Sequence, residues 1–121
     1  MKYPVSGAVT DALITATRSF NLLGATISPG RVLWLKKVWI FAPTGPASCV
    51  IGDVANAVTG MSLTTGAATG PYTRIGFGVT ASGHATLDLP DPGMKFTGYC
   101  TIAMCVTGGG LTMAGGEGYE A

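Results

Sequence analysis

The segment from Arg31 to Phe41, RVLWLKKVWIF, constrains the fold more than any other part of this chain. Read as a β-strand it is apolar on both faces, because successive side chains of a strand point to opposite sides of a sheet. One face would carry Val32, Trp34, Val38 and Ile40, and the other Leu33, Leu35, Trp39 and Phe41. A chain of 121 residues rarely covers both faces of such a strand alone. We therefore expect the second face to contact another subunit or another protein.

The two tryptophans are the strongest candidates for that contact. Trp34 and Trp39 lie five positions apart, so on a regular strand they occupy opposite faces. We expect one of them in the core and the other at a subunit interface, where tryptophan is enriched. A sugar-stacking platform is the alternative role for an exposed tryptophan. The candidate interface residues are Trp34, Trp39, Leu33, Leu35, Phe41 and Tyr119, and the sequence does not choose between the two faces.

Charge is scarce in this chain and is not clustered. Charged residues make up 11% of the sequence, against about a quarter in typical soluble proteins. Low charge argues against disorder, and also against a free monomer whose whole surface faces water. The formal net charge is +1, with seven scattered basic residues, so we expect no nucleic-acid partner. The only basic pair, Lys36 and Lys37, would lie on opposite faces of a regular strand.

Three cysteines, Cys49, Cys100 and Cys105, cannot all pair within one chain. Cys100 and Cys105 would fall on opposite faces of a strand, which places them poorly for a disulfide. The odd count in small-residue surroundings indicates buried thiols in a reducing compartment. With no CxxC pair and a single histidine, the sequence predicts no metal site and no cofactor.

No segment reads as a signal peptide or a transmembrane helix. The start, MKYPVSGAV, lacks the long apolar run of a secretion signal. The most hydrophobic run is interrupted by Lys36 and Lys37, well short of the roughly twenty apolar residues that a bilayer requires. We therefore expect no membrane partner.

Turn signals recur every eight to twelve residues and no helical period is sustained, which is typical of an all-β fold. We predict an antiparallel β-sandwich or jelly-roll-like barrel of about 7–9 short strands. Residues 1–121 are expected to form a single domain, with a Gly-rich C-terminal tail at about 115–121 that holds no structure of its own, although Tyr119 could anchor it. The expected extended segments are 5–18, 20–27, 31–41, 47–54, 72–80, 84–89, 99–107 and 111–114, with one short strand within 56–70.

The residues that catalysis would need are not combined in any motif. His84 and Asp88 share a face if 84–89 is a strand, but they would lie about 13 Å apart, at roughly 3.3 Å per residue. Asp53 and Asp91 are expected to close turns by accepting hydrogen bonds from nearby backbone N–H groups. The glycine clusters at 108–110 and 115–118 match no phosphate-binding loop. The sequence therefore predicts no catalytic residue and no enzyme.

The order of several segments resembles the small β-sandwich virion proteins of tailed bacteriophages. These segments are SPGRVLWLKKVWIFAP, a strand ending in GDVAN, DPGMKFTGYCTIAMCVTGGG and the closing GGEGYEA. The resemblance implies a jelly-roll-like fold and a non-enzymatic structural role as a capsid decoration, cement or minor head protein. It also implies a homo-oligomer, with a trimer favoured, that binds the major capsid protein or other virion proteins.

The expected location is then the capsid surface of the virion, after synthesis in the host bacterial cytoplasm. The N-terminus lacks the long capsid-binding arm that such proteins can carry. Two alternatives stay open at this point. One is a tail or baseplate component, and the other is a carbohydrate- or receptor-binding β-sandwich module that uses an exposed tryptophan or tyrosine.

Overall fold

The computed structural model describes residues 2–11, 19–43, 47–55, 62–64, 67–69, 74–79, 83–106 and 111–121, which contain eleven strands and no helix. The strands are β1 (Tyr3–Asp11), β2 (Ser19–Asn21), β3 (Leu33–Ala42), β4 (Ala47–Gly52), β5 (Ser62–Thr64), β6 (Ala67–Thr69), β7 (Ile75–Val79), β8 (Gly83–Asp88), β9 (Met94–Phe96), β10 (Thr101–Val106) and β11 (Thr112–Glu120). Every strand pair is antiparallel, so the predicted all-β class is confirmed. The strands outnumber the 7–9 expected because β2, β5, β6 and β9 have only three residues each.

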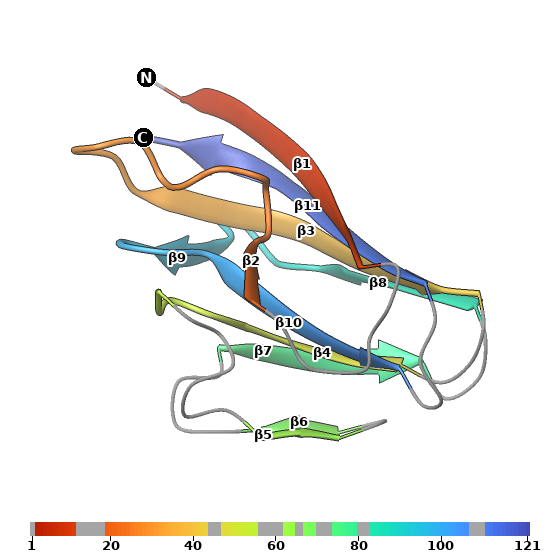
Figure 1. Ribbon diagram of the computed structural model, residues 1–121. Coiled ribbons are helices and arrows are strands. Elements are labelled where there is room, and N and C mark those ends of the chain that lie inside the picture. The colour runs from red at the N-terminus through yellow and green to blue at the C-terminus, as the bar shows by residue number, and fades with distance from the viewer. Residues whose placement is uncertain are drawn as a thin grey trace.

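The strands form a β-sandwich with jelly-roll topology (Figure 1). Sheet A has the order β1-β11-β3-β8, with β9 beside β3, and sheet B has the order β2-β10-β4-β7. Strands that pair run inward from the two chain ends: β1 with β11, β2 with β10, β3 with β8 and β4 with β7. This winding of antiparallel pairs into two facing sheets is the jelly roll.

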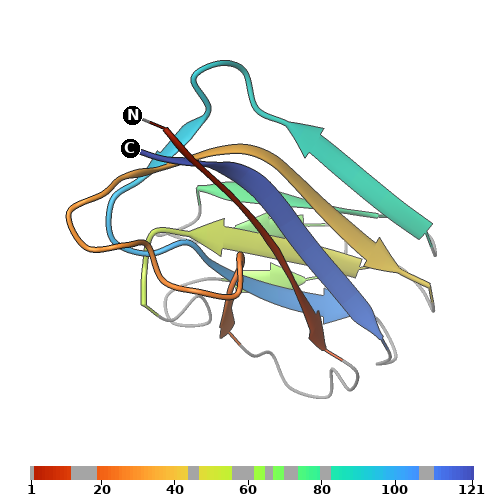
Figure 2. The same ribbon diagram turned by 90° about the horizontal axis from the view of Figure 1, so that it is seen from above.

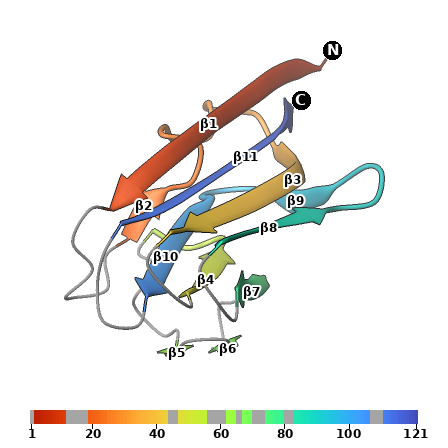
Figure 3. The same cartoon turned by 90° about the vertical axis from the view of Figure 1, so that its right-hand side faces the viewer.

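The core lies between the two sheets (Figure 3). Inward side chains alternate with outward ones on β8, where Ala85 and Leu87 pack against the core while His84, Thr86 and Asp88 are exposed. This alternation was predicted for residues 84–89, and it is confirmed. Sheet A contributes Leu33, Leu35, Val38, Ile40, Ala42, Phe96 and Ala114 to the buried cluster, and sheet B contributes Ala47, Cys49, Ile51, Ile75, Ile102 and Met104.

Burial on both faces occurs in sheet B, in β4 and β10. Val50 and Ala103 are opposite each other, fully buried, and outside the cluster between the sheets. The β5–β6 hairpin contacts both strands and lies beneath sheet B, on the side away from sheet A (Figure 1). The chain therefore covers the second face of these two central strands with its own hairpin.

Two expected strands differ from the structure at their ends. Of the expected 20–27 segment only residues 20 and 21 lie in a strand, β2, because residues 22–25 turn away and place Leu22 in the core. The expected 5–18 segment forms β1 as far as Asp11, and its remainder lies outside the described residues. β9 was not predicted, since three residues next to a proline-rich turn leave almost no periodic signal.

Strand β3 contains a β-bulge at Lys36 and Lys37. Its partner β11 continues from Glu117, opposite Lys37, directly to Gly118, opposite Leu35. Lys36 is thus the extra residue, and the bulge reverses the phase of alternation between the two halves of the strand. Leu33, Leu35, Val38, Ile40 and Ala42 are buried, whereas Trp34, Lys37, Trp39 and Phe41 lie at the alternate, outward positions.

The expectation that Trp34 and Trp39 occupy opposite faces is therefore wrong, and neither ring belongs to the fully buried core. The same correction applies to Lys36 and Lys37, which both reach carboxylates on the solvent side. A regular strand would turn one ammonium group into the core, at a cost of several kcal/mol. The bulge keeps both lysines solvated and all the aliphatic side chains inside.

The glycine-rich C-terminal segment is a full strand, which corrects the expected unstructured tail at about 115–121. β11 lies between β1 and β3 and is hydrogen-bonded along both sides. Its glycines allow close approach: a Cβ on Gly116 would lie 2.7 Å from the carbonyl oxygen of Lys37, and one on Gly115 would lie 2.5 Å from the Trp39 ring. Pairing on both sides supplies the order that glycine itself does not.

We expect Gly116→Ala to lower the free energy of unfolding by about 1–3 kcal/mol, because its methyl group would press on the backbone of β3. Chemical denaturation measures this change. Thr86→Ala, on the exposed face of β8, serves as the control and should stay within about 0.5 kcal/mol of wild type. Equal stability of the two variants would contradict the close approach of β11 to β3.

Candidate interaction surface

The outer face of sheet A carries a row of aromatic side chains that we call the aromatic stripe: Trp34, Trp39, Phe41 and Tyr119. Directly opposite residues in an antiparallel pair share a face, and Tyr119 lies opposite Trp34 across β3 and β11. Phe41 lies opposite Met113 on one side and His84 on the other. Figure 2 looks onto this face, and no described element crosses in front of it.

Four of the six predicted interface residues belong to the aromatic stripe, and two do not. Leu33 and Leu35 are only 2% and 0% exposed and pack between the sheets, so they are corrected to core residues. Phe41 is 38% exposed, and the other three rings are partly exposed. The bulge causes this division, because it places both tryptophans on one side of β3.

The Trp39 indole lies across β11, over Gly115. Two shallow hollows of about 310 and 470 Å³ follow β1 and β11 on the same face. Ser6 and Glu117 line both hollows, Tyr119 borders the first, and Trp39 borders the second. The described part of the chain offers the Glu117 carboxylate no hydrogen bond or ion pair, so its charge is available to a partner.

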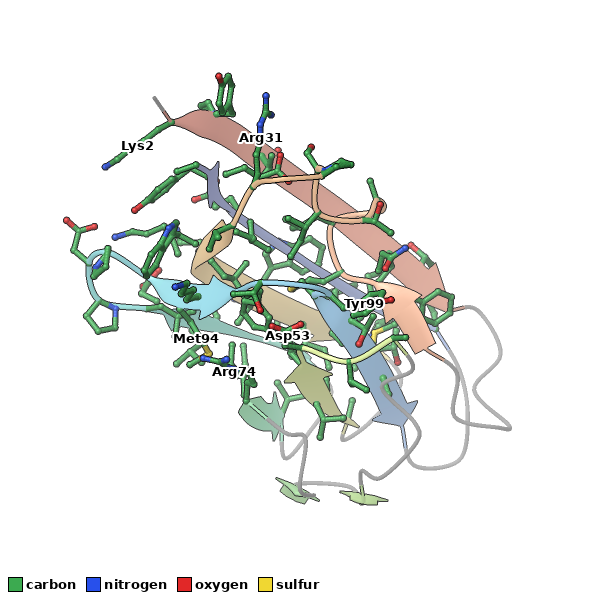
Figure 4. The ribbon with its side chains drawn as sticks, turned by 90° about the vertical axis from the view of Figure 1, so that its left-hand side faces the viewer. Lys2, Arg31, Asp53, Arg74, Met94 and Tyr99 are labelled. Carbon is green, nitrogen blue, oxygen red and sulfur yellow. The ribbon has the colours of Figure 1, made fainter. Side chains whose placement is uncertain are left out.

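Two lysines lie over rings of the aromatic stripe, at the end of the face where both termini are found (Figure 1). Figure 4 labels one of them, Lys2. Lys95 Nζ is 5.9 Å from the centre of the Trp34 ring, and Lys2 Nζ is 4.6 Å from that of Tyr119. The Tyr119 hydroxyl donates a hydrogen bond to the carbonyl oxygen of Pro92 at 3.3 Å. This end of the stripe is therefore aromatic and positively charged.

The bulge lysines are neutralised from the β8 side of the sheet. Lys37 Nζ is 3.7 Å from Asp88, and Lys36 Nζ contacts Asp91 and lowers the pKa of that carboxyl group through a hydrogen bond and its charge. The expectation that Asp91 closes its own turn is wrong, since the Gly93 N–H closes it by donating to the Pro90 carbonyl at 2.7 Å. Sequence reasoning missed this pairing because the residues are far apart along the chain.

Asp53 joins two loops at the end of the sandwich (Figure 4). It accepts hydrogen bonds from the backbone N–H groups of Thr97, Gly98 and Tyr99 at 2.9, 3.2 and 2.7 Å, and from the Thr97 hydroxyl at 3.1 Å. Burial raises the pKa of Asp53, but these hydrogen bonds together lower it below its usual 3.8. The expectation that Asp53 closes its own turn is therefore wrong, because the N–H groups that it accepts from lie in a distant loop.

Glu120, the last residue of β11, also joins distant parts of the chain. Its carboxylate accepts hydrogen bonds from the Ser28 N–H at 2.9 Å and the Ser28 hydroxyl at 2.8 Å, and it lies 3.6 Å from Arg31. The Ser28 N–H contributes most to a lowered pKa of Glu120, and it outweighs burial. Arg31 also lies over the Tyr3 ring, 3.7 Å from its centre. The contacts of Glu120 and Arg31 therefore hold the β2–β3 loop against β1 and β11.

The described residues contain no group of three or more His, Cys, Asp or Glu side chains that could hold a metal ion, and none of their elements is a helix able to span a membrane. Cys49 and Cys100 are buried, and burial together with the charge of Asp53 raises the pKa of Cys100 to about 12. Such a thiol is a poor nucleophile at neutral pH. No family model and no curated protein matches this chain.

We expect the stability of this protein to fall as pH drops below about 4.5, the ordinary pKa of a glutamate. A carboxyl group whose pKa is lowered in the folded state stabilises it above the unfolded pKa, and this contribution disappears as pH falls through the folded value. Glu120→Gln should therefore flatten the dependence of unfolding free energy on pH between about 5 and 2. Thr86→Ala should keep the wild-type slope, and an unchanged slope in Glu120→Gln would contradict this role.

Proposed function

We propose that this protein is a non-enzymatic structural protein that attaches to a larger protein assembly through the aromatic stripe. The observation that carries the proposal is the gathering of Trp34, Trp39, Phe41 and Tyr119 on one sheet face that no described element covers. Tryptophan and tyrosine dominate the energetics of protein interfaces. The β5–β6 hairpin supports the same reasoning, because it covers the outer face of sheet B, whereas no described element covers the outer face of sheet A.

The assembly that we propose is the virion of a tailed bacteriophage, with this chain as a capsid decoration or cement protein on the major capsid lattice. The resemblance of the sequence to such virion proteins supports this, as does the jelly-roll topology, which viral capsid domains share with lectins and enzymes. The low charge of the chain also suits a protein whose surface is largely covered.

The size of the stripe suggests that several copies bind together. Covering four partly exposed rings of about 150–250 Å² each removes at most on the order of 200–350 Å² of apolar surface. At about 25 cal/mol per Å² this gives at most about 5–9 kcal/mol. Association itself costs about 4–15 kcal/mol, so a single stripe binds weakly. A homo-oligomer that engages several lattice sites at once overcomes this limit through effective concentration.

We expect Trp34→Ser and Trp39→Ser each to weaken binding to phage heads prepared without this protein by about tenfold or more, because truncating a central interface aromatic commonly costs at least 1–2 kcal/mol. Co-sedimentation with heads measures this. The matched control is Tyr99→Ser, which removes a 43% exposed ring from the loop before β10.

Wild-type binding by the double variant Trp34→Ser/Trp39→Ser would contradict the stripe as the attachment surface. Absence of the protein from purified virions would contradict the virion role. Binding to a glycan array that is lost in Trp39→Ala, without binding to heads, would favour the carbohydrate-binding alternative. The hollow beside Trp39, Ser6 and Glu117 offers a sugar a ring face and polar groups.

A further inference from the structure

We propose that the free edge of β1 pairs antiparallel with β1 of a second copy, around a two-fold axis at Gly7, and so joins two five-stranded sheets into one continuous sheet. This refines the assembly role proposed above by naming how copies associate. It uses the edge of sheet A and not the aromatic stripe, so the two contacts can fail independently. A two-fold dimer also differs from the trimer that the resemblance implies.

The edge of β1 away from β11 is long, and no described strand pairs with it. Among the described strands β1 pairs only with β11, along all nine residues from Tyr3 to Asp11. Proteins usually protect edges with charges, prolines, bulges or short strands. Residues 3–10 carry no charge, and their single proline, Pro4, lies near one end of the strand. The other edge strands are shorter: β2 and β9 have three residues each, β7 has five, and β8 has six, including His84 and Asp88.

The sequence of β1 fits pairing with itself. Val5, Gly7 and Val9 lie on the core side of sheet A, and Ser6 and Ala8 on its outer side. When Gly7 lies opposite Gly7 of a second copy, all nine residues pair, and Val5 faces Val9 of the second copy twice. Core sides then match core sides. A shift by one residue would instead set Val5 against Ala8 or Thr10, and Val9 against Pro4 or Ser6.

The sandwich is open beside Pro4, Val5 and Ser6, where a second copy would cover apolar surface. At Gly7 the backbone of Leu23 already packs against the core side of β1. A cleft of about 440 Å³ lies between β1 and the loop that follows β2, lined by Val5, Leu23, Ile27 and Leu33 among others. Val5, Val9, Leu23 and Ile27 are only partly buried. An added strand places its own Val5 and Val9 alongside this opening and extends the core across the axis.

The charges near the strand do not oppose pairing with itself. In the same register, position 11 lies opposite Tyr3 of a second copy, and the ring of Tyr3 lies 3.7 Å from the guanidinium of Arg31. No like charges are brought together within residues 3–11, so a second copy is a better occupant of the edge than an acidic or basic peptide.

A pair of double variants tests this register. Ser6 and Ala8 are both exposed on the outer side, and each would lie opposite the other across the axis. Ser6→Lys/Ala8→Lys sets like charges opposite each other twice and should weaken the dimer by about tenfold or more. Ser6→Lys/Ala8→Glu sets opposite charges there and should keep the dimer at least as tight as the wild-type dimer at low salt, and about tenfold or more tighter than in Ser6→Lys/Ala8→Lys.

Analytical ultracentrifugation at micromolar concentration measures the association, and circular dichroism confirms that both variants are folded. Dimeric wild type and Ser6→Lys/Ala8→Glu beside monomeric Ser6→Lys/Ala8→Lys would support the proposal. A wild-type monomer or trimer, or equal association of the two double variants, would overturn it. Trp34→Ser should remain dimeric even though its binding to heads is weakened. A wild-type dimer that fails to bind heads would refute the proposed function while leaving the edge pairing intact.

Discussion

Two adjacent lysines in the middle of the central strand determine how this protein presents its surface. Lys36 and Lys37 interrupt an otherwise apolar strand, and a regular alternation would bury one of them. Burial of an unpaired ammonium group costs several kcal/mol, whereas a bulge forfeits roughly one ladder hydrogen bond, about 1 kcal/mol. The bulge is therefore the cheaper solution, and it assigns five aliphatic side chains to the core and both tryptophans to the outer face.

Neighbouring parts of the chain are fitted to this bulge. The carbonyl oxygen of Lys36 accepts a hydrogen bond from the Leu89 N–H at 2.8 Å, and Asp91 and Asp88 pair with the two ammonium groups. On the other side, Gly116 and Gly118 of β11 leave room for the β3 backbone. The loop after β8 and the glycines of β11 thus both accommodate the bulge in β3. This explains why a glycine-rich segment lies in the middle of a sheet.

The sequence predicted the fold class because strand alternation and turn residues are local signals, as β8 and β10 illustrate. It did not predict the phase of β3, since a regular period carries Trp34 and Trp39 to opposite faces. The adjacent lysines between two apolar runs were the available signal for a bulge. The pairings of Asp53 with the Thr97 loop and of Asp91 with Lys36 depend on tertiary structure, over 44 and 55 residues, and no local pattern reveals them. For Tyr119, composition indicated a flexible tail, and pairing on both sides of β11 decided otherwise.

The most direct test of the bulge is the solvent access of the two tryptophans, measured one at a time. Trp34→Phe and Trp39→Phe each leave a single fluorophore in a protein free of particles. Because both rings lie on the open face of sheet A, acrylamide should quench the fluorescence of both variants, and neither should emit at the short wavelengths of a buried indole. A regular strand predicts that one variant resists quenching and emits like a core tryptophan, and that result would contradict the bulge and the stripe that depends on it.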